Sequence, residues 1–125
     1  MANPFVHVEL NTTDLDKAKK FYGQLFDWKL EDVEMGPTGR YTMIKPGNAA
    51  GPGTGGGMLK HPDPGSPSSW LAYVEVDDVA AATRKAKALG AKVMVDVKEI
   101  PEAGTMSIIV DPTGAALGLW KSKTA

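Results

Sequence analysis

Hydrophobic and polar residues alternate along the first part of the chain, over Phe5–Asn11. The apolar members of this alternation are Val6, Val8 and Leu10. A period of two predicts a strand with one face on a core and the other in more polar surroundings. Asp14 then offers a cap for a helix start, and apolar residues recur three and four apart as far as Leu25. This pattern predicts an amphipathic helix that ends near Asp27.

Three further strands are expected after this helix, because short apolar segments alternate there with glycine and proline. They are predicted at Lys29–Val33, Arg40–Lys45 and Gly57–Lys60. The glycine-rich segment Gly47–Gly57 is interpreted as a lid or a long hairpin connection. A phosphate cradle is not favoured there, because the segment leads into a strand and not into a helix. His61–Ser69, with its prolines and serines, is interpreted as a linker.

The same order of elements returns after the linker. One constant offset pairs Val6–Leu10 with Trp70–Val74 and Asp14 with Asp78. The later elements are predicted as a helix at Ala80–Leu89 followed by the cap Gly90, and strands at Lys92–Val97, Met106–Val110 and Ala115–Lys121. The sequence therefore predicts one domain, residues 1–125, built from two βαβββ modules at about 5–60 and 70–121.

Composition narrows the class of protein. The 125 residues, 42% of them hydrophobic, suit a single core. The net charge of −1, from 14 basic and 15 acidic residues, gives no reason to expect nucleic acid or a membrane surface as a partner. The absence of cysteine excludes disulfides and thiolate sites and is typical of a reducing compartment. With no apolar stretch of about 20 residues, we expect a cytoplasmic protein.

Four motifs in this order resemble the vicinal oxygen chelate superfamily, the glyoxalase, bleomycin-resistance and extradiol-dioxygenase group. They are His7–Tyr22, Gly55–Met58, Val76–Val79 and Val110–Gly114. The resemblance implies an α+β fold in which two βαβββ modules form a curved mixed sheet around a cleft. It also implies a second subunit, so that a homodimer is expected.

The resemblance further implies a divalent metal held by side chains from the first and last strand of each module. His7 occupies the first of these positions and is the only ligand kept. Leu71 and Gly118 stand at two others, and Met58 is assigned to the fourth. A leucine or a glycine has no donor atom, and a thioether is a poor ligand for such ions. The sequence therefore predicts no metal and no cofactor.

Two carboxylates offer an alternative to this expectation. Glu9 and Glu75 alternate onto the face of the sheet opposite the helices, where they could help rebuild a divalent metal site. The ligand-binding residues predicted on this face are His7, Glu9, Met58, Leu71, Tyr73 and Trp120. His7 and Glu9 are also the candidates for catalysis, as a general acid and base.

Three classes of function stay open on this evidence. The favoured one is a glyoxalase- or bleomycin-resistance-like protein that binds a small organic molecule in the cleft without a metal. The second is an enzyme of lyase, isomerase, hydrolase or dioxygenase type with a metal-independent or rebuilt site. The third is an interaction module within a larger assembly.

Overall fold

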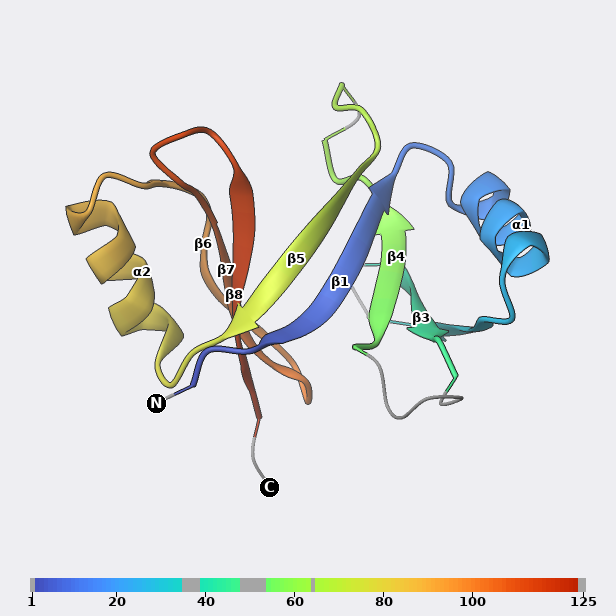
Figure 1. Ribbon diagram of the computed structural model, residues 1–125, viewed down its shortest axis with the longest axis horizontal. Helices are drawn as coiled ribbons and strands as arrows, with labels where there is room; N and C mark the ends of the chain where they lie inside the picture. The colour runs from blue at the N-terminus through green and yellow to red at the C-terminus, as the bar shows by residue number, and fades with distance from the viewer. Residues whose placement is uncertain (1, 35–38, 48–53, 64, 124–125) are drawn as a thin grey trace. The chain divides into compact units, whose positions relative to one another are not determined.

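The computed structural model describes residues 2–34, 39–47, 54–63 and 65–123. Most of the segment interpreted as a lid, residues 48–53, lies outside the described residues. Within the described ranges the fold is α+β, and strand, helix and three strands follow one another twice, as predicted (Figure 1). The chain forms two compact units, His7–Leu71 and Met1–Val6 with Ala72–Ala125.

Module one contains the first five elements. They are β1 (Phe5–Thr12), α1 (Leu15–Leu25), β2 (Lys29–Glu34), β3 (Arg40–Lys45) and β4 (Gly56–Lys60). The strand order is β2-β3-β4-β1, with β1 parallel to β4 and the other pairs antiparallel. The carboxylate of Asp14 accepts a hydrogen bond from the Lys17 amide at 3.0 Å and caps α1, as its position in the sequence predicts.

Module two repeats this arrangement. Its elements are β5 (Ser69–Glu75), α2 (Val79–Ala88), β6 (Lys92–Ile100), β7 (Gly104–Val110) and β8 (Ala116–Ser122). The order is β5-β8-β7-β6, again with a parallel pair between the first and last strands of the module. Asp78 caps α2 through the Ala81 amide at 3.0 Å. Gly90 follows α2 with a φ of 105°, the left-handed conformation that glycine adopts most easily.

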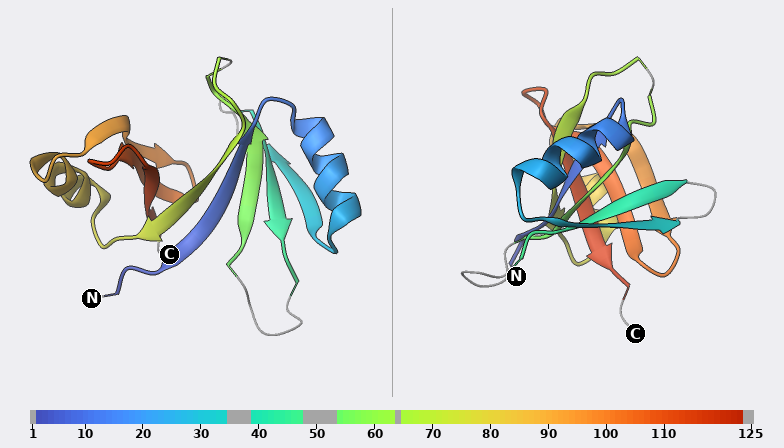
Figure 2. Two further views of the ribbon diagram at one scale, coloured as in Figure 1. Left: turned by 45° about the horizontal axis from the view of Figure 1, so that its top comes forward. Right: turned by 90° about the vertical axis from the view of Figure 1, so that its right-hand side faces the viewer.

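In each module one helix covers one face of the sheet (Figure 2). The core of module one lies under α1 and consists of Leu10, Leu15, Ile44 and Met58. The core of module two lies under α2 and consists of Val79, Ile109 and Leu119. Because side chains alternate along a strand, the neighbours of these residues point to the other side. We call that side the helix-free face of the module.

An ion pair fastens α1 to the sheet of module one. Lys19 Nζ lies 2.8 Å from Asp32 Oδ2, and the Thr42 hydroxyl donates to Asp32 Oδ1 at 2.7 Å. These hydrogen bonds lower the pKa of Asp32 below its ordinary value of 3.8, and the bond from Lys19 has the largest effect. The carboxylate is partly exposed, so its contribution to stability is small.

We expect Asp32→Asn to reduce the free energy of unfolding at neutral pH by less than about 1 kcal/mol. A carboxylate with a lowered folded-state pKa stabilises the fold above its ordinary pKa and loses this effect as the pH falls through the folded value. Denaturant unfolding over a pH series should therefore show the difference between the two proteins shrinking below pH 3.8. A difference that grows on acidification would contradict this account.

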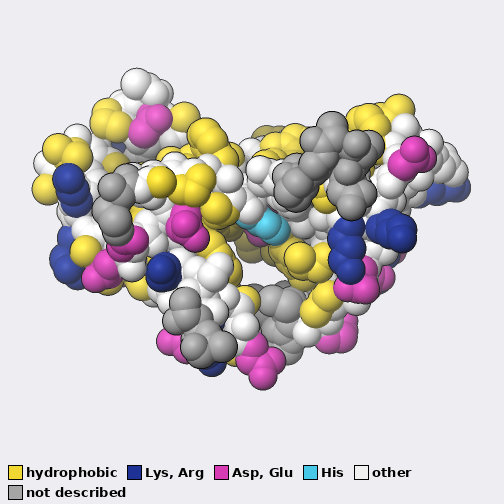
Figure 3. Space-filling model, turned by 60° about the horizontal axis from the view of Figure 1, so that its bottom comes forward, with side chains coloured by type: hydrophobic (Ala, Val, Ile, Leu, Met, Phe, Trp, Pro, Cys, Tyr) yellow, Lys and Arg dark blue, Asp and Glu magenta, His cyan; other side chains and the backbone are white. Residues whose placement is uncertain are grey.

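The surface carries charges of both signs. Acidic and basic side chains lie among one another on the face shown in Figure 3. Of the two helices in the described part of the chain, neither is long and apolar enough to cross a membrane.

Candidate functional site

The helix-free face of module one carries a group of polar side chains. Since Leu10 of β1 points into the core, its neighbours Glu9 and Asn11 point to the helix-free face, and so does His7. Glu9 lies opposite Gly57 of β4, and Gly57 lies opposite Met43 of β3. The alternation along β3 brings Tyr41 to this face as well.

The hydroxyl of Tyr41 joins His7 to Glu9. His7 Nε2 lies 2.7 Å from Tyr41 Oη, and Tyr41 Oη donates to Glu9 Oε2 at 3.0 Å. Asn11 Nδ2 donates to the other oxygen of the Glu9 carboxylate, Oε1, at 3.4 Å. We call the hydrogen-bonded residues His7, Tyr41 and Glu9 the His7–Tyr41–Glu9 chain. It connects two strands that are far apart in sequence.

The ionisation state of Glu9 decides the direction of these hydrogen bonds. A phenol has one hydrogen, and an ionised carboxylate can only accept. If Glu9 is ionised, Tyr41 gives its hydrogen to Glu9, and His7 then donates to Tyr41 from Nε2. In neutral His7 the hydrogen is then on Nε2 and the lone pair is on Nδ1. Burial lowers the pKa of His7 below its ordinary value of 6.5, because desolvation disfavours the charged imidazolium.

We expect the stability of the fold to fall as the pH drops below 6.5, the ordinary pKa of histidine. In that range the unfolded chain takes up a proton at His7 that the folded chain does not, until the pH reaches the lower folded-state pKa. His7→Gln should remove this part of the pH dependence. A titration by NMR in which His7 changes charge at or above pH 6.5 would contradict the assignment.

Gly57 makes room for Tyr41. A side chain at Gly57 would overlap the hydroxyl and the ring carbons Cε2 and Cζ of Tyr41. Tyr41 was not among the residues predicted for the site. Two signals in the sequence point to it, namely the alternation within β3, which sets Tyr41 and Met43 against Thr42 and Ile44, and the glycines of β4.

The helix-free face of module two carries apolar and aromatic side chains beside Glu75. Tyr73 of β5 lies opposite Gly118 of β8, and Trp120 lies opposite Met106 of β7. Leu71 and Tyr73 are buried, with 7% and 5% of their surface exposed. The indole nitrogen of Trp120 donates to the Ser122 hydroxyl at 2.9 Å, which fixes the edge of the ring. Leu71, Tyr73, Glu75 and Trp120 thus lie on the face of the sheet that the sequence predicts for them.

The expectation that Met58 shares the face of His7 is wrong. Met58 lies opposite Leu10 in the β1–β4 pair, and its fully buried side chain belongs to the core under α1. A shift of one residue along a strand moves a side chain to the other face. The position of β4 on the helix-free face is Gly57, which corresponds by register to Gly118 in module two.

The residues at the implied metal positions do not fit a divalent metal. Leu71, Gly57 and Gly118 bring no donor atom, and His7 Nε2 is already hydrogen-bonded with Tyr41. Across the described ranges, no three His, Asp or Glu side chains are grouped so that they could hold a metal ion. This holds also for sets that include Glu9 or Glu75, the alternative pair.

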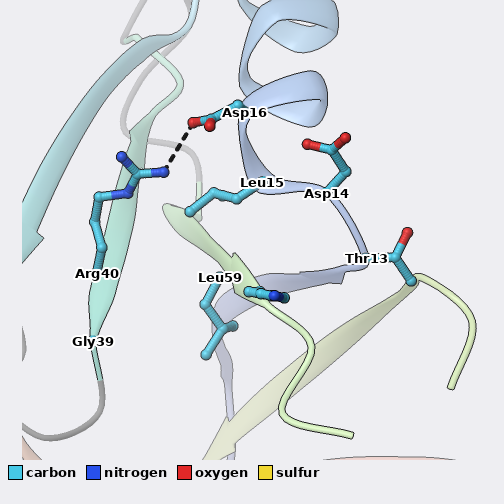
Figure 4. Close-up of a pocket in the computed structure, with 8 residues that line it drawn as sticks. Thr13, Asp14, Leu15, Asp16, Gly39, Arg40 and Leu59 are labelled. Carbon is cyan, nitrogen blue, oxygen red and sulfur yellow. Dashed lines mark hydrogen bonds and ion pairs between the residues drawn. The ribbon is translucent and has the colours of Figure 1, made fainter. Parts of the chain in front are cut away.

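A groove of about 570 Å³ lies at the start of α1 (Figure 4). Its lining consists of Thr13, Asp14, Leu15, Asp16, Gly39, Arg40, Leu59 and Lys60. Arg40 Nη2 lies 2.9 Å from Asp16 Oδ1, and the Asp14 carboxylate already accepts the helix amide of Lys17. Because Arg40 and Asp16 pair with each other and Asp14 caps α1, we do not place the functional site in the groove.

The chain belongs to the Glyoxalase/Bleomycin resistance protein/Dioxygenase superfamily, whose family model matches residues 5–119. It is 41% identical over 120 residues to proteins described as "Putative glyoxylase CFP32" in Mycobacterium bovis and in Mycobacterium tuberculosis. These matches cover 92% of this chain and 44% of each relative. The chain therefore spans less than half the length of these curated relatives.

Solved structures show the same fold. A methylmalonyl-CoA epimerase from Mycobacterium tuberculosis matches with a TM-score of 0.67 at 16% identity, over 96% of this chain and 88% of that one. A methylmalonyl-CoA epimerase in complex with methylmalonyl-CoA and NH4+ matches with a TM-score of 0.71 at 17% identity, over 99% and 97%. A hypothetical protein from Bacillus halodurans C-125 matches with a TM-score of 0.71 at 15% identity, over 100% and 99%.

Proposed function

We propose that this protein binds a small organic molecule on the helix-free face of module one, with the His7–Tyr41–Glu9 chain as the polar anchor and without a divalent metal. The observation that carries the proposal is the position of the Tyr41 hydroxyl, 2.7 Å from His7 Nε2 and 3.0 Å from Glu9 Oε2. His7 and Glu9 are held by a phenol between them and do not converge on a cation.

The chemistry of this face suits an organic ligand. Sites for small molecules combine apolar walls with a few polar groups of fixed orientation. Tyr41 supplies both a ring and a hydroxyl, and its two hydrogen bonds fix the position of the hydroxyl. On its own helix-free face, module two offers Leu71, Tyr73 and Trp120, which we propose as contacts for the apolar parts of organic ligands.

A screen of small organic compounds by protein-observed NMR in chelator-treated buffer tests the proposal. We expect the compounds that bind to shift the resonances of His7, Glu9 and Tyr41. Binding that is confined to the groove at the start of α1, through Arg40 and Lys60, would contradict the proposed site.

A second candidate function is metal-free proton transfer, as in a lyase or an isomerase. The observation that favours it is a neutral imidazole hydrogen-bonded through Tyr41 to the carboxylate of Glu9, since general acid and base catalysis needs groups that exchange protons near neutral pH. Methylmalonyl-CoA, which one structural neighbour binds, is a reasonable first probe.

Incubation of methylmalonyl-CoA with the protein in D2O and EDTA tests this candidate. If the protein removes and returns a proton at the acidic carbon of the probe, deuterium appears there faster than in buffer alone. Glu9→Gln should slow the exchange and leave the melting temperature nearly unchanged, because glutamine keeps the size of the side chain. Exchange at the same rate in both proteins would exclude Glu9 from proton transfer.

We also propose that the protein is a homodimer. The side chains of Phe21, Leu25 and Phe26 at the end of α1 are 57%, 56% and 45% exposed, and a second copy would cover this apolar surface. Sedimentation at micromolar concentration should give the mass of two chains, and Phe21→Lys should give the mass of one. A monomer in both cases would contradict the proposal.

A further inference from the structure

Each module carries a glycine on its last strand against which a tyrosine ring lies. In module one the ring of Tyr41 lies against Gly57 of β4, and in module two the ring of Tyr73 lies against Gly118 of β8. The two glycines occupy equivalent places, because each lies opposite the third helix-free residue of its module's first strand, Glu9 or Tyr73. The two tyrosines come from different strands, β3 and β5, so only the arrangement of ring and glycine is shared.

The rings, and not the backbone, require these glycines. Neither Gly57 nor Gly118 has the positive φ that favours glycine, in contrast to Gly90 and Gly114. At Gly118 a β-carbon would overlap the Tyr73 ring atoms Cγ, Cδ2 and Cε2. At Gly57 it would overlap the hydroxyl end of Tyr41. Any side chain at either position must therefore displace a ring.

We propose that Gly57 and Gly118 are specificity-determining positions. Because neither residue has a side chain, a tyrosine ring can lie on each helix-free face. With the ring in place, each face binds planar organic groups and not a divalent cation. The proposal rests on the proposed function, since it assumes that these faces bind organic molecules. The position that the family resemblance assigns to a metal-binding glutamate is Gly118, and the register makes Gly57 its counterpart. A carboxylate side chain and the tyrosine ring cannot occupy this space together.

The two faces differ in what surrounds the ring. In module one the Tyr41 hydroxyl lies between an imidazole and a carboxylate, so that this face suits a ring with polar substituents. In module two Tyr73 shares its face with Leu71 and Trp120, and the Trp120 ring lies in the same way against a glycine, with Cζ2 at 2.8 Å from a β-carbon position on Gly104. This face suits a planar apolar group.

NMR titrations with two probes, indole and Mn²⁺, test the proposal. Indole should shift resonances around Tyr41 and Tyr73, whereas Mn²⁺ should not broaden those of His7 or Gly118. Gly57→Ala should weaken the binding of indole to module one by about ten-fold, the equivalent of losing one good aromatic contact, and leave module two unchanged. Gly118→Ala should have the converse effect. In each variant, indole binding to the unchanged module thus serves as the control.

Gly56→Ala is the matched control for stability, because a methyl group there overlaps the Val8 carbonyl and touches neither ring. It should destabilise the fold without selective loss of indole binding. If an alanine variant at Gly57 or Gly118 does not fold, Tyr41→Leu and Tyr73→Leu remove the rings and keep the glycines, and the same loss is expected.

Unchanged indole binding in the alanine or leucine variants would overturn the proposal, and so would selective broadening of His7 or Gly118 by Mn²⁺ in the unmodified protein. These outcomes differ from a failure of the proposed function. That failure would show as the absence of any organic ligand at the His7–Tyr41–Glu9 chain, whatever residue stands at the glycine positions.

Discussion

Met58→Ala is expected to lower the free energy of unfolding by about 2–5 kcal/mol, the range for removing a large apolar side chain from a core. Met58 is fully buried and packs with Leu10, Leu15 and Ile44 beneath α1. The truncation leaves a cavity that close-packed neighbours cannot fill completely. Denaturant unfolding measures the loss.

Leu59→Ala provides the control, because Leu59 is the next residue of β4, points to the other face and is only half-buried. Its truncation should cost clearly less stability. Ligand affinity per folded molecule should be the same in Met58→Ala as in the unmodified protein. A Met58→Ala variant that keeps its stability and loses ligand affinity would show that Met58 contacts the ligand. This result would contradict the placement of Met58 under α1.

Tyr41→Phe is expected to weaken binding at the module-one face by about ten-fold or more, since one lost hydrogen bond to a charged group has about this effect. Phenylalanine keeps the ring against Gly57 but removes the atom that joins His7 to Glu9. The imidazole nitrogen shifts of His7 should also change, because Nε2 loses its hydrogen-bond partner. Isothermal titration and ¹⁵N NMR measure the two effects.

Tyr22→Phe is the matched control for this substitution. Tyr22 lies on α1, packs against the core under that helix and stacks on Trp28, with ring centroids 5.7 Å apart. The same change of chemistry there should alter neither affinity nor the shifts of His7. Equal affinities and equal His7 shifts in Tyr41→Phe and the unmodified protein would contradict the role of the His7–Tyr41–Glu9 chain.

The parts of the fold that depend on local pattern were predictable from the sequence. Asp14 and Asp78 cap the helices as predicted, and alternation along β1 and β5 places His7, Glu9 and Tyr73 on the helix-free faces. The element ends differ by a few residues. The largest such difference is β6, which continues to Ile100, past the predicted end at Val97.

What could not be predicted depends on register between strands. The first two residues of β4, Gly56 and Gly57, carry no side chain whose polarity would reveal the phase of the alternation, and so Met58 was assigned to the wrong face. Tyr41 was missed for a similar reason. Tyr41 contacts His7 and Glu9 only because β3 and β1 pair with β4 on either side and in a particular register. This pairing cannot be read from the sequence of any one strand.

The central claim is that organic ligands bind without a divalent metal, and calorimetric titration of a compound from the screen tests it most directly. The titration is carried out in EDTA and again with Mn²⁺ or Zn²⁺ in excess. We predict the same Kd under all conditions, together with a melting temperature of the free protein that EDTA does not lower. Binding that is lost in EDTA and restored by the metal ion would contradict the account.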